Sequence, residues 1–306
     1  MTTNLRERFE NFLKRSGQSQ EGIAKSLGIS GSAVSTWRKN AYKGDNERVE
    51  SLINTYLDRQ ESMEKESKGM KEDFDFVFTS VYENVIKGAD AARLRHGIRV
   101  VTGESGVGKT TALDHLKSED KSMILLKAYA GIRKNRVLSK LCREAGLSGR
   151  GSFDDCFEEL VARLDGTNRL IAIDEAEHLP IDAVDAIRRL NDFARVPVVF
   201  VGLPKFIEIL RTYQYEYAYV YNRISIPVDT DKLNDEDIER MVATVIDFEI
   251  PTGVWQKACR GIGRDLRELV LESLRIARLN GVTPGNNQDF IDVIEVVKKQ
   301  LGRNIQ

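Results

Sequence analysis

Four short, largely apolar runs recur through the middle of the chain, at residues 98–102, 123–127, 170–173 and 197–201. Such a run is typical of a strand that is buried on both faces of a parallel sheet. Segments with helical spacing of apolar residues alternate with these runs, at residues 110–118, 134–146, 153–164, 180–194 and 204–212. The alternation predicts an α/β fold, in which a parallel sheet is flanked by helices on both faces.

The two ends of the chain have helical patterns instead. Apolar residues recur at helical spacing in residues 5–13. Residues 20–37 follow the pattern of a helix-turn-helix, with Gly28 in the turn and Ser30 as the cap of the second helix. One more helix is predicted at residues 47–57. Beyond residue 230 the pattern is helical again, at residues 233–238, 265–279 and 287–301.

These patterns divide the chain into three folded parts and a linker. We expect an all-α helix-turn-helix DNA-binding domain at residues 1–60, an α/β core at 74–229 and a small helical domain at 230–306. Residues 61–73 are charged, mixed in sign and poor in apolar anchors, which is typical of a linker. They could equally prolong the preceding helix. The length of 306 residues suits two or three domains.

The overall charge gives no sign of a nucleic-acid partner. The formal net charge is −1 and the isoelectric point is near 6.4, so any DNA contact must come from local basic patches. The three cysteines are odd in number and widely spaced, which fits free thiols in a reducing compartment. Because the sequence contains neither a signal-peptide pattern nor an apolar run of transmembrane length, we expect a cytoplasmic location and no membrane partner.

The most specific motif follows the first predicted strand. Residues 103–110 read GESGVGKT, the G-x-x-x-x-G-K-T pattern of a phosphate-binding loop. Its glycines let backbone N–H groups turn toward phosphates, Lys109 supplies a charge to the β and γ oxygens, and the Thr110 hydroxyl can hold Mg²⁺. The motif therefore predicts ATP with Mg²⁺ as the ligand. The expected nucleotide-binding residues are Gly103, Glu104, Ser105, Gly106, Val107, Gly108, Lys109, Thr110 and Thr111.

An acidic pair ends the third apolar run. Asp174 and Glu175 follow residues 170–173 directly, and the carboxyl ends of parallel strands meet at one edge of a sheet. We expect Asp174 to join Thr110 in holding the metal and to contribute to cofactor binding. Glu175 is the predicted base that orients or deprotonates the attacking water. The pair completes the predicted ATPase site.

Three groups of polar and basic residues are candidates for DNA contact. The exposed side of the second predicted helix of the helix-turn-helix offers Ser32, Ser35, Thr36, Arg38 and Lys39. A loop after the second strand and the helix after Asp174 supply the others, Arg133, Lys134, Arg136, Arg188 and Arg189. Basic groups that track phosphates bind DNA with little sequence preference and strong salt dependence. The alternatives are a helical protein-interaction surface for the first group and solvated faces for the other two.

A phosphate-loop core followed by a small helical domain resembles the AAA+ ATPases. That resemblance implies a polar sensor residue at the end of strand 197–201, where residues 201–203 read VGL and depart from the pattern. Arg223 matches an arginine that commonly reaches the nucleotide of a neighbouring subunit. Arg267 matches the lid arginine called sensor 2. As catalytic residues, both would stabilise charge on the γ-phosphate. A surface ion pair for Arg223 and a solvated helix face for Arg267 are the alternatives.

The order of the domains is similar to one family of AAA+ proteins in particular. The chain resembles the family of the B transposition protein of bacteriophage Mu, the ATP-dependent target-DNA activators. The resemblance extends over nearly the whole chain, and its specific pieces are residues 43–49 (KGDNERV), 103–110, 174–179 (DEAEHL) and 265–267 (DLR).

The family resemblance implies partners and a mechanism. Its members are ATPases that polymerise on double-stranded DNA with little sequence preference and deliver that DNA to a transposase. Contact with the transposase then stimulates hydrolysis and disassembly. The alternative from the residues alone is an ATP-dependent loader or signalling switch, or a transcriptional regulator that reads one DNA site through the helix-turn-helix.

Overall fold

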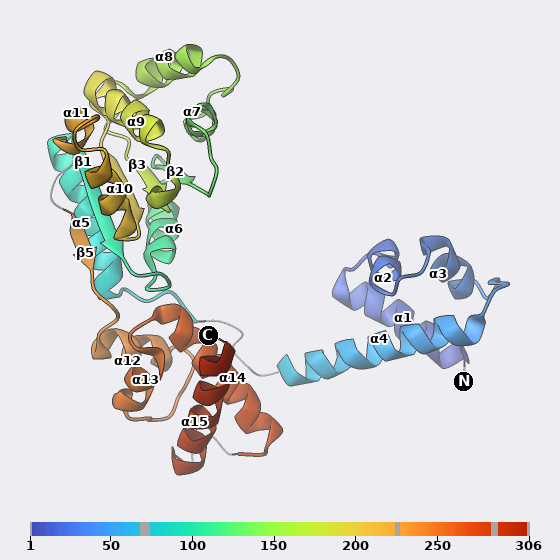
Figure 1. Cartoon of the computed structure of the whole chain (residues 1–306). Coiled ribbons are helices and arrows are strands. Elements are labelled where there is room, and N and C mark those ends of the chain that lie inside the picture. Colours follow the sequence, from blue (N-terminus) through green and yellow to red (C-terminus); the bar gives the residue numbers. More distant parts are fainter. Residues whose placement is uncertain (1, 68–73, 224–226, 283–286, 305–306) are drawn as a thin grey trace. The chain divides into compact units, whose positions relative to one another are not determined.

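The chain folds as two units, Met1–Glu72 and Asp73–Gln306, which are described separately. The computed structural model describes residues 2–67, 74–223, 227–282 and 287–304 (Figure 1). In those residues no helix is both long enough and apolar enough to cross a membrane.

In its described residues, 2–67, the N-terminal unit contains four helices around one apolar core. The helices are α1 (Thr2–Ser16), α2 (Gln20–Ser26), α3 (Gly31–Arg38) and α4 (Asn46–Ser67). Phe9, Ile23 and Trp37 meet in the core, and the ring of Phe9 packs edge-on against Trp37 at 5.7 Å. Ser30 caps α3 as predicted, because its hydroxyl accepts the N–H of Ala33 at 3.2 Å.

Helix α4 is longer than the sequence pattern predicted. We predicted a helix at 47–57 and, for residues 61–73, either a linker or a continuation of that helix; α4 continues to Ser67, so the second alternative holds for residues 61–67. A contact across the unit explains the extension: Arg8 on α1 pairs with Asp58 at 2.6 Å and with Glu61 at 2.7 Å. These ion pairs hold the charged continuation of α4 against α1, so the segment does not need apolar anchors. Residues 68–73 of the predicted linker lie outside the described residues.

The larger unit is built on a five-stranded parallel sheet. Its strands are β1 (Ile98–Gly103), β2 (Ile124–Lys127), β3 (Ile171–Asp174), β4 (Val198–Gly202) and β5 (Val228–Thr230). They lie in the order β2-β3-β4-β1-β5. The register pairs Val101 with Val201 and Lys127 with Asp174, so the carboxyl ends of β1 and β3 lie at the same edge of the sheet.

Helices cover both faces of this sheet, as the alternating pattern predicted. Val101 and Val199 face a core shared with α5 (Ser80–Arg95) and α6 (Lys109–Glu119). Val100 and Phe200 face the opposite core. That second core is shared with α7 (Lys134–Glu144), α8 (Phe153–Leu164), α9 (Ile181–Ala194) and α10 (Lys205–Thr212). The short helices η1 (Ala176–His178) and α11 (Ala218–Tyr221) lie in the connections.

Helix α5 was not predicted from the sequence. Gly88 interrupts its pattern, and glycine in a helix interior is unfavourable by about 1 kcal/mol relative to alanine. The structure explains why glycine stands there: a Cβ at residue 88 would lie 2.5 Å from a methyl group of Val101. Close packing of α5 on β1 therefore requires glycine at residue 88.

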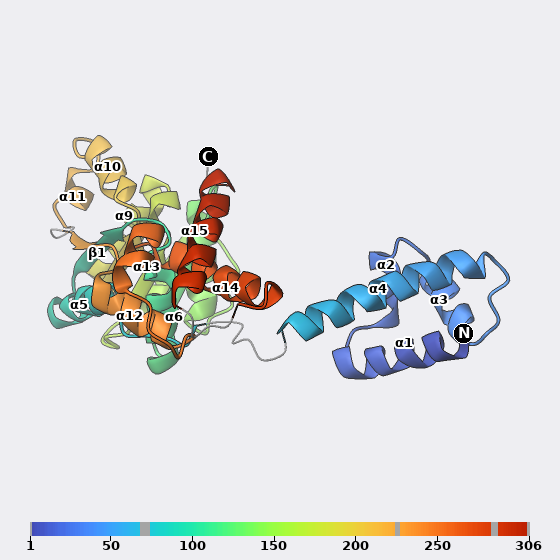
Figure 2. The ribbon, with the colours of Figure 1, turned by 90° about the horizontal axis from the view of Figure 1, so that it is seen from below.

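The described residues of the C-terminal part of this unit form four helices. These helices lie together in both views (Figures 1 and 2). They are α12 (Asp235–Ala243), α13 (Thr252–Cys259), α14 (Gly263–Leu279) and α15 (Asn287–Asn304). Trp255, Leu266 and Phe290 are fully or almost fully buried in their common core. Helix α13 was not predicted, whereas the other three begin within two residues of the predicted segments.

A buried carboxylate joins this helical part to the sheet-bearing part. Asp237 of α12 is fully buried and accepts hydrogen bonds from the N–H (3.0 Å) and hydroxyl (2.6 Å) of Ser80, the first residue of α5. Arg240 donates to the same carboxylate at 2.8 Å. Because a buried charge is stable only with such partners, Asp237 ties α12 to the start of α5.

We expect Asp237→Asn to destabilise this unit by about 2 kcal/mol, because an amide cannot satisfy the Ser80 donors and Arg240 together. For a unit of this size the melting temperature should fall by about 4–8 °C. Thermal unfolding followed by circular dichroism measures the effect. Asp235→Asn, in the exposed first turn of the same helix, is the matched control and should change stability by less than about 0.5 kcal/mol. Equal melting temperatures for the two variants would contradict this assignment.

Candidate nucleotide site

The phosphate-binding loop connects β1 to α6. Gly106 and Gly108 have positive φ angles of 82° and 116°, which glycine adopts without strain, and these angles shape the turn before α6. The ammonium group of Lys109 donates to the carbonyl oxygens of Gly103 and Glu104, both at 2.7 Å. Lys109 is therefore held along its own loop, where phosphate oxygens would replace the carbonyl partners.

Thr110 and Asp174 come together as the sequence predicted. The Thr110 hydroxyl donates to Asp174 at 2.8 Å, and Asp174 is only 2% exposed. Burial raises the pKa of Asp174, while the Thr110 hydroxyl and the N–H of Glu175 oppose that rise. A hydroxyl and a carboxylate are the oxygen ligands that Mg²⁺ prefers, so the donor set fits this cation.

Glu175 follows Asp174 in an unusual backbone conformation. Its φ angle is +54°, in the left-handed region that non-glycine residues seldom adopt. The side chain is 54% exposed, and its carboxylate lies 3.9 Å from the His178 ring nitrogen. The backbone thus turns Glu175 away from the sheet and into the cavity that surrounds the phosphate loop.

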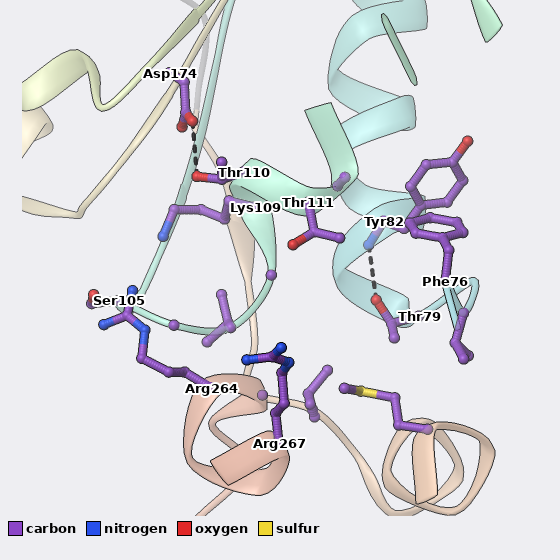
Figure 3. A pocket seen from close by; sticks show the side chains of 18 of the residues that line it. Phe76, Thr79, Tyr82, Ser105, Lys109, Thr110, Thr111, Asp174, Arg264 and Arg267 are labelled. Carbon is purple, nitrogen blue, oxygen red and sulfur yellow. Dashed lines mark hydrogen bonds between the residues drawn. The ribbon is translucent and has the colours of Figure 1, made fainter. Parts of the chain in front are cut away.

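That cavity has a volume of about 690 Å³, within the range of small-molecule sites (Figure 3). One end is aromatic: Phe76 stacks on His115 at 3.7 Å, and the Tyr82 hydroxyl donates to Glu119 at 3.0 Å. Burial and this hydrogen bond raise the pKa of Tyr82 to about 12. An aromatic end and a phosphate loop in one cavity suit a nucleotide. The site residues predicted from the sequence that line this cavity are Ser105, Gly106, Val107, Gly108, Lys109, Thr110, Thr111, Asp174, Glu175 and Arg267.

Two predicted loop residues take supporting positions instead. Gly103 is buried, and a Cβ there would lie 1.9 Å from the Thr230 hydroxyl, so only glycine allows β5 to approach β1. Glu104 pairs with Lys232 at 3.3 Å. These contacts connect the loop to β5 and to the chain that leads into α12.

Two arginines reach the cavity from α14 (Figure 3). Arg267 was predicted, whereas Arg264 was missed. The backbone N–H of Arg264 donates to the carbonyl oxygen of Gly106 at 3.0 Å. The guanidinium group of Arg264 extends along the phosphate loop (Figure 3). Residues three apart share one helix face, so the spacing of the two arginines in residues 263–267 could have indicated Arg264.

Glu177 is a second residue that sequence reasoning missed. Its carboxylate lines the cavity and accepts the N–H of Leu203 at 3.0 Å. Burial lowers the pKa of Lys109; nearby carboxylates oppose this, Glu177 most strongly, then Asp174 and Glu175. The positive charge of Arg264 also lowers the pKa of Lys109. The sequence DEAE at residues 174–177 has a second glutamate shortly after the strand end, and this could have indicated Glu177 as a site residue.

Arg223 lies away from this cavity. It is exposed and pairs with Asp192 of α9 at 3.5 Å. The neighbouring Asn191 donates to the carbonyl oxygens of His96 (2.8 Å) and Val196 (2.7 Å), which precede β1 and β4. Arg223 is therefore near the edge where the strands begin, opposite the phosphate loop of its own chain.

The N-terminal DNA candidates differ in their surroundings. Ser32 and Lys39 are exposed, and Ser35 is half-buried. The Thr36 hydroxyl donates to the Ser32 carbonyl at 2.7 Å. Arg38 forms a two-pronged ion pair with Glu10 of α1, at 2.6 and 2.7 Å. Arg38 therefore already holds α3 against α1, and the exposed candidates are Ser32 and Lys39.

The predicted DNA-contact residues of the larger unit also differ in their surroundings. Arg133 and Arg136 are exposed at the start of α7, beyond the carboxyl end of β2. Lys134 lies over the Phe153 ring at 4.6 Å and 3.7 Å from Asp182. Arg188 is paired with Asp185 and Asp192 of its own helix, and Arg189 is exposed but lies over the Phe157 ring at 5.1 Å. Arg133 and Arg136 are thus the most accessible basic pair among the candidates.

The parallel sheet, the phosphate loop, the acidic strand end and the helices α12–α15 together have the arrangement of the AAA+ ATPase fold. Residues 92–210 match a family model described as an AAA domain. Two solved structures share the fold. A Walker-type ATPase of Pyrococcus abyssi matches with a TM-score of 0.51 and 17% identity, over 77% of this chain and 76% of that chain. The ORC2 protein of Aeropyrum pernix matches with a TM-score of 0.50 and 14% identity, over 70% and 66%.

Curated relatives narrow the similarity to transposition proteins. The chain is 26% identical over 281 residues to the ATP-dependent target DNA activator B of Escherichia phage Mu, covering 88% of this chain and 86% of the relative. It is 25% identical over 240 residues to the Mu-like prophage FluMu DNA transposition protein B of Haemophilus influenzae, covering 77% and 83%. The predicted resemblance to B transposition proteins is confirmed.

Proposed function

We propose that this protein is an ATP-dependent activator of target DNA in transposition. With ATP it polymerises on duplex DNA with little sequence preference and delivers that DNA to a transposase, and hydrolysis drives disassembly. The observation that carries the proposal is the extent of its similarity to the phage Mu activator. A match over 88% of the chain is longer than the ATPase unit, Asp73–Gln306, and so it extends into the N-terminal unit.

The residues of the cavity support the part of this proposal that concerns ATP binding and hydrolysis. Lys109 and the loop N–H groups would bind the β- and γ-phosphates. Thr110 and Asp174, which are joined by a hydrogen bond, would hold Mg²⁺. When bound, the metal ion offsets phosphate charge. Glu175 accepts the proton of the attacking water. Arg267 and Arg264 line the cavity from α14, where they would contact the phosphates and so link the helices α12–α15 to the nucleotide state.

Arg223 supports self-association. It is exposed at the sheet edge opposite its own phosphate loop, so it can reach a γ-phosphate only in another chain. An arginine supplied in this way stabilises charge at the moment of phosphoryl transfer. We propose that neighbouring subunits complete each other's sites, which makes hydrolysis depend on assembly along DNA.

The DNA surface is proposed from the exposed basic groups. Arg133 and Arg136 project at the start of α7, and Lys39 lies just beyond α3. Contacts of this kind go to phosphates, which carry no sequence information. A protein that relies on them binds many sequences and loses affinity as salt rises.

The first experiment measures binding of the full chain to two unrelated DNA duplexes, with ATP or ADP, together with negative-stain imaging. We expect filaments on both duplexes with ATP and none with ADP. Binding that prefers one duplex would instead support a transcriptional regulator. If neither duplex bound with either nucleotide, a loader or signalling switch that acts on protein would replace the present proposal.

A paired variant tests the DNA surface in the same assay. Arg133→Ala with Arg136→Ala should lower the slope of log affinity against log salt by roughly 2, because each released phosphate contact contributes about 0.9. The control is Arg150→Ala, an exposed arginine beyond the end of α7, which should leave the slope unchanged. An unchanged slope in the paired variant would remove this loop from the DNA surface.

A further inference from the structure

The carboxyl end of β4 lacks the polar residue that the AAA+ resemblance implies at that position. The strand ends at Gly202, which lines the nucleotide cavity, and Leu203 follows. The space that a side chain would take there is already filled. A Cβ at residue 202 would lie 2.3 Å from a carboxylate oxygen of Glu177 and 3.2 Å from the N–H nitrogen of Ala176.

Glu177 reaches this space from the neighbouring strand. The short helix η1 begins directly after β3, which pairs with β4 through Ile173 and Phe200. One carboxylate oxygen, Oε2, accepts the N–H of Leu203 at 3.0 Å. This bond fixes the carboxylate at the end of β4, and within the described part of the chain the other oxygen, Oε1, has no hydrogen-bond donor.

The two glutamates of the cavity differ in where their charges act. Glu175 is 54% exposed, and its carboxylate lies 3.9 Å from the ring nitrogen of His178. Glu177 is held between the ends of β3 and β4, and of the carboxylates near Lys109 it acts on the ammonium group most strongly. Glu177 therefore lines the nucleotide cavity at the end of β4, the strand that pairs with β1, from which the phosphate loop begins.

We propose that Glu177 is a catalytic residue that replaces the missing polar residue of β4, its Oε1 atom orienting the attacking water beside the γ-phosphate. The inference rests on the ATPase activity. The water oxygen forms a bond to the γ-phosphorus, and the bond from that phosphorus to the β–γ bridging oxygen breaks. The proton of the water passes to Glu175, and ADP leaves with the electron pair. Glu177 remains ionised throughout.

A pair of substitutions tests the replacement directly. Glu177→Ala should lower kcat for ATP hydrolysis about 100-fold, a usual loss for one orienting group. Gly202→Asn alone should also lower kcat, because its side chain collides with Glu177. The double variant returns a polar group to β4 without the collision with Glu177, and the remaining close contact is the one of 3.2 Å between the new Cβ and the Ala176 nitrogen. Its kcat should therefore exceed that of Glu177→Ala by about 10-fold.

Nucleotide affinity gives a readout that does not depend on turnover. Because Glu177→Ala removes a negative charge beside the γ-phosphate, ATP should bind at least as tightly as to the wild type, and ADP affinity should stay within about twofold. Glu177→Gln keeps an oxygen for the Leu203 N–H, so it should fold normally and lose about 10-fold in kcat. Glu158→Gln, on the exposed face of α8, is the control and should match the wild type.

Two results would overturn the inference. One is a kcat within twofold of the wild type for Glu177→Ala. The other is a loss of kcat that Gly202→Asn does not repair, combined with a lower melting temperature and faster hydrogen exchange at Leu203, which would make Glu177 a strand clamp only. ATP hydrolysis by the wild type serves as the reference in the same assay. An ATPase with any biological function would hydrolyse ATP, so these results test Glu177 independently of the target-DNA proposal.

Discussion

Lys109→Ala is expected to weaken ATP binding by about 100-fold and to abolish ATP-dependent DNA binding. Lys109 is 9% exposed, and its ammonium group donates two hydrogen bonds of 2.7 Å to carbonyl oxygens of its own loop. We propose that these bonds go to phosphate oxygens when ATP is bound. Each charge-assisted bond contributes about 1.5–3 kcal/mol, so a total loss near 3 kcal/mol is expected.

The measurement is the dissociation constant for a fluorescent ATP analogue, followed by DNA binding at a fixed ATP concentration. Lys121→Ala, an exposed lysine beyond α6, serves as the control and should retain both activities. Circular dichroism should show that Lys109→Ala keeps its helical content. DNA filaments formed by Lys109→Ala with ATP at wild-type concentrations would show that nucleotide binding does not control assembly.

Glu175→Gln is expected to lower ATP hydrolysis by about 1,000-fold and to trap the ATP-bound complex on DNA. The substitution keeps the size of the side chain but removes the group that accepts the proton, a role that contributes about 10²–10⁴ in rate. The backbone at residue 175 has φ +54°, and glutamine has the same preference there as glutamate. ATP binding through Lys109 and Thr110 is therefore expected to remain.

Single-turnover hydrolysis and the lifetime of the DNA complex measure this effect. The lifetime should lengthen in ATP and stay at the wild-type value in ADP, because only the step between the two nucleotide states is blocked. Glu158→Gln again provides a matched exchange of carboxylate for amide. If Glu175→Gln hydrolysed ATP normally, Glu175 would not be the base.

The two largest effects fall on residues that the sequence identified. The phosphate loop is contiguous, and its glycine, lysine and threonine positions follow from phosphate chemistry alone. Asp174 and Glu175 follow a run of four apolar residues, so their place at a strand end could also be predicted. Local periodicity and contiguous motifs were thus sufficient for four of the five strands, for most of the helices that flank the sheet and for the first set of site residues, whereas β5 (Val228–Thr230) was not predicted.

Contacts between distant parts of the chain decided the remaining features. Helix α4 extends to Ser67 because Arg8 binds Glu61, and α5 tolerates Gly88 because Val101 packs there. Glu177 reaches the end of β4 because β3 lies beside it, a sheet order that no local pattern contains.

The sequence by itself determined the class of ligand, the phosphate loop and the acidic strand end, because each is carried by neighbouring residues with one dominant chemical role. The tertiary structure decided which further charges line the cavity. It brought Arg264 and Glu177 to the cavity and Arg223 to the opposite edge of the sheet. These positions depend on how strands and helices pack, and packing joins residues whose separation along the chain gives no signal.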